Sequence, residues 1–200
     1  MTPVPPTTIE TERLLLRVPT DADIAPLAAF IEDPDFSRYI PKSKVVRTPM
    51  ERAERLIGIY RRRWEEEPLN AMGWSTIRKS DARFIGICGV EGVPETADGE
   101  IDYRLGPPFW GQGYATEAAR AMVRFSFEQT TWDRDVAAVV HANAPSVRVI
   151  EHLGFVFEKE VNYLEMAGDP NLVLDPPFVS YYVLRRDQYT PGDAFYRLTD

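Results

Sequence analysis

The stretch that most constrains the fold runs from residue 109 to residue 140. It opens with FWGQGYATEA (109–118), continues as a segment that is apolar around much of its circumference at helical spacing, and ends in the unbroken apolar run VAAVV (136–140). A helix with that pattern is buried on most sides. An apolar run without alternation is typical of a strand covered on both faces of its sheet. These residues therefore predict a well-buried helix at 114–129 followed by a central strand.

The remaining segments alternate between strand-like and helical patterns. Thr48, Pro49 and Glu51 have the spacing of a helix capping box with proline at the first helical position. Breakers separate three strands between residues 71 and 105, which predicts an antiparallel meander. The predicted strands are 13–18, 71–78, 83–91, 100–105, 136–140, 155–161 and 178–185, and the predicted helices are 21–33, 49–67, 114–129 and 146–153. We expect one mixed α/β domain at 9–200 and a loose Pro- and Thr-rich arm at 1–8.

Charge and cysteine content exclude several classes of protein. The 200 residues include 23 Lys and Arg and 31 Asp and Glu, a net charge of −8. A general nucleic-acid binder needs a basic surface, so nucleic acid is not an expected partner, whereas a negative field can attract a cationic amine. A single cysteine, Cys88, rules out an internal disulfide, and the two histidines have no zinc-site spacing, so no metal is expected.

The chain also has no pattern that directs it to a membrane. No apolar run reaches the length of a membrane-spanning helix. The N-terminal residues lack the basic and apolar regions of a signal peptide. We therefore expect a cytoplasmic protein with no membrane partner.

The first candidate site is the Gly-bearing turn at 109–118. Gly111 and Gly113 precede the helix at 114–129, and without a Cβ they allow a ligand to approach the backbone closely. The free N–H groups and the dipole of a helix N-terminus favour an anion such as a pyrophosphate. The alternative is that the glycines only permit a tight turn. The segment is neither a P-loop nor a dinucleotide-binding fingerprint, because the required lysine and glycine spacings are absent.

The second candidate site lies about thirty residues downstream. Asn143 and Ser146 stand where the predicted central strand enters the helix at 146–153. Asn can donate and accept hydrogen bonds to an amide-bearing ligand, and Ser is a short proton donor. Both residues are also good helix caps, so capping is the alternative interpretation.

Considered together, these segments resemble the GNAT superfamily of acyl-CoA-dependent N-acyltransferases. The closest likeness is to the RimJ/RimL-like branch of ribosomal-protein N-terminal acetyltransferases. The motifs that carry it are TERLLLR (11–17), EIDYRL (100–105), WGQGYATEA (110–118) and NAPSVRVIEHLGF (143–155). The superfamily loop is Q/R-x-x-G-x-G/A; Gly113 and Ala115 match it, whereas Trp110 occupies the Gln/Arg position. The resemblance implies a single α/β domain with a mixed central sheet, helices on both faces, and a parallel strand pair that splays apart near 100–105 and 136–142.

The resemblance also implies acetyl-CoA as co-substrate. The pantetheine arm would lie between the two splayed strands and pair with strand amides that begin near Leu105. Asn143 would bind the arm or order the acceptor, and Ser146 would lie near the thioester sulfur. The family also allows a homodimer. The pyrophosphate would bind to Trp110, Gly111, Gln112, Gly113, Tyr114, Ala115 and Thr116.

Acetyl transfer to an amine needs a base, because a protonated amine cannot attack a thioester. An amine with a pKa near 10.4 is neutral in about one molecule per thousand at pH 7, whereas an N-terminal amine with a pKa near 7.8 is far easier to deprotonate. Glu100 is the candidate base because the superfamily often has a carboxylate at this place. The alternative is that Glu100 is an ordinary solvent-facing strand residue, and Glu91 is the second candidate base.

The departing thiolate needs a proton donor. Many superfamily members have a Tyr four residues before the Gly-Phe pair, but Ile150 stands there in this chain. The resemblance suggests Ser146 as the substitute. Other potential donors and nucleophiles are weaker candidates: Tyr103 and Tyr114 are more remote donors, Cys88 is expected in the core, and His141 and His152 are expected to be structural or exposed.

The acceptor is the least constrained feature. The branch favours a protein or peptide N-terminal amine, and the missing Tyr donor suits such an easily deprotonated amine. The alternatives are a small amine, such as an amino acid, polyamine or aminoglycoside, and a non-catalytic acyl-CoA sensor. We expect residues 36–41, the helix after Thr48 and the segment 162–178 to select the acceptor.

Overall fold

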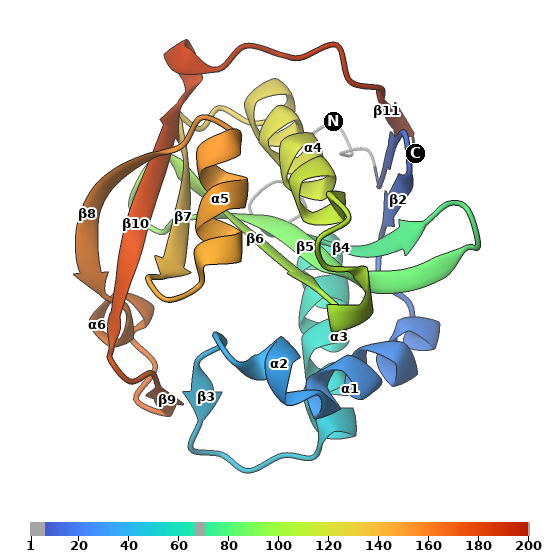
Figure 1. Ribbon diagram of the computed structural model, residues 1–200, viewed down its shortest axis with the longest axis vertical. Helices are drawn as coiled ribbons and strands as arrows, with labels where there is room; N and C mark the ends of the chain where they lie inside the picture. Colours follow the sequence, from blue (N-terminus) through green and yellow to red (C-terminus); the bar gives the residue numbers. More distant parts are fainter. Residues whose placement is uncertain (1–6, 67–70, 200) are drawn as a thin grey trace.

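The computed structural model describes residues 7–66 and 71–199. Within them, nine strands form one mixed sheet in the order β11-β1-β2-β4-β5-β6-β7-β10-β8 (Figure 1). Every neighbouring pair is antiparallel except β6 and β7, which are parallel. The strands are β1 (Thr8–Thr11), β2 (Leu14–Arg17), β4 (Ala71–Arg78), β5 (Arg83–Gly92), β6 (Asp98–Leu105), β7 (Arg134–Val140), β8 (Val156–Asn162), β10 (Phe178–Arg185) and β11 (Tyr196–Thr199). The predicted meander is confirmed as β4-β5-β6.

Helices cover both faces of this sheet. The helices are α1 (Ile24–Glu32), α2 (Pro34–Ser37), α3 (Pro49–Glu66), α4 (Tyr114–Gln129), α5 (Ala144–His152) and α6 (Tyr163–Ala167). Helices α4 and α5 pack on one face, and α1 and α3 pack on the other (Figure 1). The predicted α/β architecture with helices on both faces is therefore confirmed. No helix in the described part of the chain is long and apolar enough to cross a membrane.

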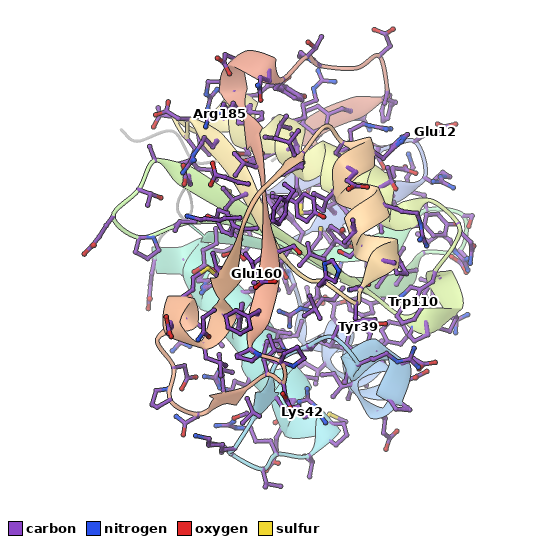
Figure 2. All side chains as sticks on the ribbon, turned by 60° about the vertical axis from the view of Figure 1, so that its left-hand side comes forward. Glu12, Tyr39, Lys42, Trp110, Glu160 and Arg185 are labelled. Carbon is purple, nitrogen blue, oxygen red and sulfur yellow. The ribbon has the colours of Figure 1, made fainter. Side chains whose placement is uncertain are left out.

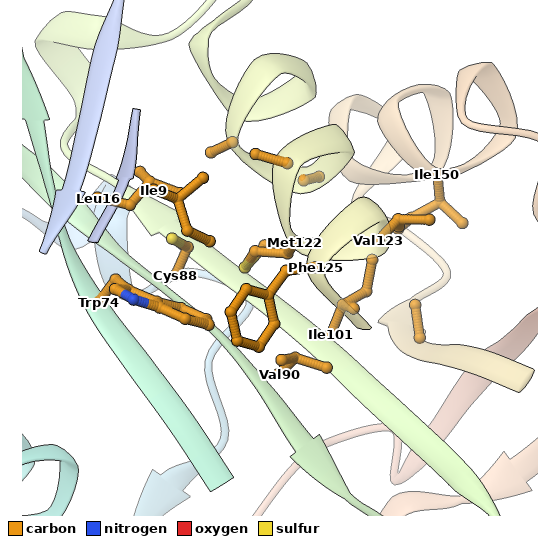
Figure 3. Packing of buried hydrophobic residues seen from close by; sticks show 14 of the residues in the cluster. Ile9, Leu16, Trp74, Cys88, Val90, Ile101, Met122, Val123, Phe125 and Ile150 are labelled. Carbon is orange, nitrogen blue, oxygen red and sulfur yellow. The ribbon is translucent and has the colours of Figure 1, made fainter. Parts of the chain in front are cut away.

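The larger core lies between the sheet and α4. Phe125 of α4 packs edge-on against Trp74 of β4, with ring centroids 5.1 Å apart. Met122 and Cys88 are fully buried beside them (Figure 3). This packing explains why α4 is apolar around most of its circumference, as the sequence pattern predicted.

Local sequence sets where α3 and α4 begin. The Thr48 backbone N–H donates to Glu51 Oε2 at 2.7 Å and the Glu51 N–H donates to Thr48 Oγ1 at 3.2 Å, so the predicted capping box is confirmed. Gly113 precedes α4 with φ of +80°, a conformation that favours glycine. The predicted last residue of the α3 helix, at 67, lies outside the described residues.

The N- and C-terminal strands differ from the sequence expectation. The strand predicted at 13–18 is β2, Leu14–Arg17, and a separate strand β1 begins at Thr8, the last residue of the predicted arm. Residues 1–6 lie outside the described residues. Strand β11 was not predicted at all; it pairs with β1 at the sheet edge, with Ile9 opposite Leu198. Such short edge strands gain their stability from pairing across the fold, which a local pattern does not encode.

The parallel pair β6–β7 opens partway along its length. Its register covers three pairs, Asp98 with Arg134, Gly99 with Asp135, and Glu100 with Val136. Both strands then continue, to Leu105 and Val140, without further pairing to each other. The splayed strand pair expected from the family resemblance is confirmed.

A second, two-stranded sheet joins two loops near the open end of this pair. Strand β3 (Lys42–Ser43) pairs with β9 (Leu172–Val173), and Figure 1 shows them side by side below α6. The Lys44 backbone N–H also donates to the Asn171 carbonyl at 2.8 Å. Neither strand was predicted, because each is only two residues long.

Candidate active site

A cavity of about 2030 Å³ occupies the region where β6 and β7 separate. Its wall includes the turn before α4, the open ends of β6 and β7, and the first turn of α5. Residues 35, 36 and 38–41 also line it, together with Tyr163 and Leu174. The two segments expected to select the acceptor, 36–41 and 162–178, therefore both contribute to this one cavity.

The turn before α4 keeps its backbone accessible to a ligand. Gly111 and Gly113 have φ of +71° and +80°, and a Cβ added to Gly111 would meet no described atom within 4 Å. The first N–H groups of α4, a 16-residue helix, have no intrahelical partner. The turn and helix N-terminus thus fit the pyrophosphate of CoA, which the sequence predicted here.

Arg13 holds this turn in place. Its Nη1 donates to the Gln112 carbonyl at 2.9 Å, its Nε donates to Glu117 Oε2 at 2.6 Å, and its guanidinium lies 4.6 Å from the centre of the Tyr114 ring. Burial of Glu117 opposes ionisation, but hydrogen bonds from Thr11 and Arg13 lower its pKa overall. The sequence analysis quoted Arg13 within TERLLLR but assigned it no role, because the contact spans about a hundred residues of chain.

Trp110 and Gln112 use their side chains within the protein. The Trp110 indole N–H donates to the Leu105 carbonyl at 2.6 Å, and Gln112 Nε2 donates to the Pro108 carbonyl at 2.9 Å. The N–H and C=O of one strand residue point to the same side, so the Leu105 N–H also faces away from β5, toward the gap. Trp110 is 48% exposed. Trp110 and Tyr39 both line the cavity, and Figure 2 labels their side chains.

Asn143 and Ser146 both line the cavity at the start of α5. Asn143 is the N-cap, and its Oδ1 accepts from the Ser146 N–H at 3.3 Å, so the capping interpretation is confirmed for Asn143. The Ser146 hydroxyl also lies 2.9 Å from the Tyr103 hydroxyl. Burial raises the pKa of Tyr103 to about 12, so this phenol remains protonated at neutral pH.

Glu100, Asp102 and Arg104 lie on the opposite face of β6 from Tyr103, because side chains alternate along a strand. All three line the cavity. Burial, reinforced by the charges of Asp102 and Glu91, raises the pKa of Glu100 to about 7. A carboxyl group with that pKa can both accept and release a proton at neutral pH. Tyr60 of α3 approaches Asp102 Oδ2 at 3.5 Å.

Glu91 is poorly placed to act as the base. Arg63 donates to both of its carboxylate oxygens, at 2.6 and 2.7 Å, and Glu91 is not among the residues that line the cavity. Glu100 faces the cavity and has no ion-pair partner among the described residues. The geometry therefore favours Glu100 over Glu91.

The other residues considered in the sequence analysis lie in the core or at the surface. Cys88 is fully buried, and burial raises the pKa of its thiol to about 12. Ile150, at the position of the usual Tyr donor, is 1% exposed in the core. His141 and His152 are both exposed, and only His152 lines the cavity. Among the described residues, no group of three His, Cys, Asp or Glu side chains could hold a metal ion.

The fold and this cavity define an acyl-CoA-dependent acyltransferase of the GNAT type. Residues 13–156 match the family model for the acetyltransferase (GNAT) domain. The match covers well over half of the chain, and the chain belongs to this family. It is an acetyl-CoA-dependent N-acetyltransferase, so the enzyme interpretation is confirmed.

Similar sequences and solved structures agree with this assignment. N-acetyltransferase p20 of Bacillus licheniformis is 30% identical over 161 residues, 80% of this chain and 88% of its own length. The protein YkkB of Bacillus subtilis is 29% identical over 78% of this chain and 88% of its own length. The structure of Mycobacterium smegmatis RimJ in complex with CoA-disulfide has a TM-score of 0.74 at 19% identity, covering 94% of this chain and 91% of RimJ. A ribosomal-protein-serine acetyltransferase structure from Vibrio cholerae has a TM-score of 0.72 at 22% identity, covering 92% and 99%. At the level of the fold, these two structures are consistent with the RimJ/RimL-like resemblance.

Proposed function

We propose that this acetyltransferase moves acetyl directly from acetyl-CoA to a primary amine in the gap between β6 and β7. The observation that carries this proposal is that β6 presents two kinds of group on its two faces. Glu100 lies on the α3 face and the Tyr103–Ser146 pair lies on the α5 face, and both line the same cavity. An amine can therefore approach from one face while the thiolate departs toward the other.

Glu100 acts as the base for the acceptor amine. The amine nitrogen forms a bond to the thioester carbonyl carbon, and the carbon–sulfur bond breaks. The ammonium proton passes to the Glu100 carboxylate, directly or through one water. Its pKa of about 7 matches this task, because a base works best when its pKa lies near the working pH.

Ser146 returns a proton to the departing thiolate, and Tyr103 supports it. The two hydroxyls are 2.9 Å apart, so a proton that leaves Ser146 can be replaced from Tyr103, which regains a proton from solvent. The pairing offers a substitute for the Tyr donor that Ile150 replaces. Asn143, whose side-chain amide also lines the cavity, contributes a polar contact to the pantetheine arm or to the acceptor.

For the acceptor, we propose an amine with a low pKa, of the kind found at a protein or peptide N-terminus. The family resemblance supports this acceptor, and the moderate basicity of Glu100 suits an amine that is easily deprotonated. A small amine is the second candidate, and one observation favours it. The cavity wall includes Arg104 as well as Glu100, so a compact acceptor could contact both side chains.

Thiol release from acetyl-CoA, measured with a panel of amines, tests the proposed activity. Acetyl-CoA should raise the melting temperature, since a ligand that binds only the folded state stabilises it. Gly113→Val should remove that rise, because valine is strained at a φ of +80° and its side chain would meet Arg13. Gly58→Ala is the matched control, since Gly58 lies in α3 with no described atom within 4 Å of an added Cβ. An unchanged rise in the Gly113 variant would show that CoA binds elsewhere.

A further inference from the structure

Arg104 is the arginine on the same face of β6 as the proposed base, and it has no hydrogen-bond partner among the described residues. The nearest carboxylate oxygen, Asp102 Oδ2, lies 3.7 Å from its Nε, which is beyond hydrogen-bond distance. By contrast, Arg13 and Arg63 each donate at least two hydrogen bonds to neighbouring groups. The guanidinium of Arg104 therefore retains free donors beside the proposed base.

Those donors face the cavity. Arg104 lines the cavity wall, its side chain is 36% exposed, and β6 places it on the same face as Glu100 and Asp102. Tyr60 and Tyr163 lie close enough to this group to interact with its charge. A guanidinium presents its donors in a rigid fork that matches a carboxylate in a bidentate arrangement.

The spacing along β6 suits a small bifunctional ligand. Glu100 and Arg104 are four residues apart on one strand, so their Cα atoms are about 13 Å apart. Both residues line the cavity, and the charge of each is close enough to shift the pKa of the other. A ligand that carries an amine and a carboxylate a few bonds apart therefore suits the pair.

We infer that Arg104 binds a carboxylate of the acceptor, so that the preferred substrate is a primary amine carrying a carboxylate within a few bonds of its nitrogen. This inference rests on the proposed function, because Glu100 must receive the amine for Arg104 to receive the carboxylate. A free α-amino acid has this chemistry, and so does a peptide whose first residue is Asp or Glu.

The test compares matched acceptors with the wild-type protein. Free amino acids are paired with their C-terminal amides, and peptides beginning with Asp or Glu are paired with the same peptides beginning with Asn or Gln. We expect kcat/KM to be at least about tenfold higher for the carboxylate member of the pairs that fit, as a charge-assisted hydrogen bond implies. The two kinds of pair distinguish a free amino acid from an acidic N-terminus as the source of the carboxylate.

Arg104→Gln should abolish this preference. The value of kcat/KM should fall about 10- to 100-fold for the carboxylate acceptor, mainly through KM, and change less than about threefold for its amide. Arg104→Lys should recover part of the preference, and Arg62→Gln, an exposed residue of α3, should leave it intact. The rise in melting temperature with acetyl-CoA should persist in every variant, which shows that each is folded and binds its co-substrate.

Three results would overturn the inference. Equal use of carboxylate and amide by the wild type would show that no carboxylate is recognised. An equal loss for both acceptors in Arg104→Gln, seen in kcat, would place Arg104 at the thioester instead. Both outcomes leave the proposed acetyl transfer intact. If no acceptor in the panel is acetylated although acetyl-CoA binds, the inference and the proposed function both fail.

Discussion

The two ends of the parallel pair β6–β7 both carry charged residues, but the surroundings of those residues differ. At the closed end, Arg134 donates to both oxygens of the buried Asp98, at 2.9 and 2.6 Å. Gly99 lies so close to Trp132 that an added Cβ would be 2.3 Å from its ring. At the open end, Glu100 and Arg104 face a cavity, and neither has a hydrogen-bond partner among the described residues.

The difference shows how one strand can serve structure and chemistry at once. Charges at the closed end are neutralised and hydrogen-bonded within the protein, which offsets the cost of burying them. Charged groups at the open end keep donors or acceptors that make no hydrogen bond within the protein. The cost of burying these groups is offset only when a ligand or water binds them. The pairing between β6 and β7 ends at Glu100. We therefore expect substitutions at the closed end to change stability and substitutions at the open end to change activity.

The largest effect is expected at the open end, from Glu100→Gln. We expect kcat/KM to fall about 100- to 1000-fold, as removal of a general base does. The wild-type rate should rise with pH through about 7, because Glu100 must lose its proton to act, and the variant should lack that rise. Thiol release from acetyl-CoA between pH 5.5 and 9 measures both.

Glu91→Gln is the matched control for this substitution. Its side chain is bound by Arg63 outside the cavity wall, so kcat should be retained. The rising limb should move slightly to lower pH, since the charge of Glu91 helps to raise the pKa of Glu100. A large loss of activity in Glu91→Gln with a normal Glu100→Gln would transfer the role of base to Glu91.

At the closed end, Arg134→Met should act on stability instead. Asp98 would remain buried without its partner, which should lower the free energy of unfolding by about 3 kcal/mol. For a chain of this length, the melting temperature should fall by roughly 6 to 12 °C. Denaturant titration and kinetics at a temperature where the variant is folded measure the two effects separately. If kcat fell while stability was unchanged, the closed end would belong to the active site.

A smaller effect is expected on the other face of β6. Ser146→Ala and Tyr103→Phe should each lower kcat about tenfold, with little change in the melting-temperature rise caused by acetyl-CoA. Because the two hydroxyls are hydrogen-bonded, the double variant should lose much less than the product of the single losses. A fully multiplicative loss would mean that the two hydroxyls act independently.

The smallest expected effect concerns a buried carboxyl group at the closed end. Burial raises the pKa of Asp135 to about 8, although hydrogen bonding from Ser126 opposes this rise. A carboxyl with a raised folded-state pKa stabilises the protein below its unfolded-state pKa, and this stabilisation is lost as pH rises through about 8. Stability of the wild type should therefore decline by about 1 kcal/mol more than that of Asp135→Asn between pH 7 and 8.5. Denaturant titrations across this range measure the decline, and parallel curves would assign Asp135 an ordinary pKa. Unlike Glu100→Gln, Asp135→Asn should leave the pH profile of the rate unchanged.

Much of the fold was predictable because its main elements carry strong local patterns. The buried helix α4 is found at Tyr114–Gln129, as its apolar circumference predicted, and the unbroken apolar run 136–140 lies in the central strand β7. The capping box at Thr48 placed the start of α3. The small strands β3, β9 and β11 were missed, because two to four residues carry too little pattern and their pairing partners are more than a hundred residues away in the chain.

The candidate site likewise contains features that local sequence predicts and features that it does not. The sequence by itself determined the Gly-bearing turn at the start of α4 and the family to which the chain belongs, because glycine placement and helix caps are local chemistry. Only the tertiary structure placed Glu100 in the cavity wall and Glu91 in an ion pair with Arg63, placed Arg13 on the turn, and brought Tyr103 to Ser146. Those results depend on which face of a strand lines the cavity and on which charged groups pair with residues distant in the chain. Burial and long-range contacts determine these two features, and the spacing of neighbouring residues does not encode them.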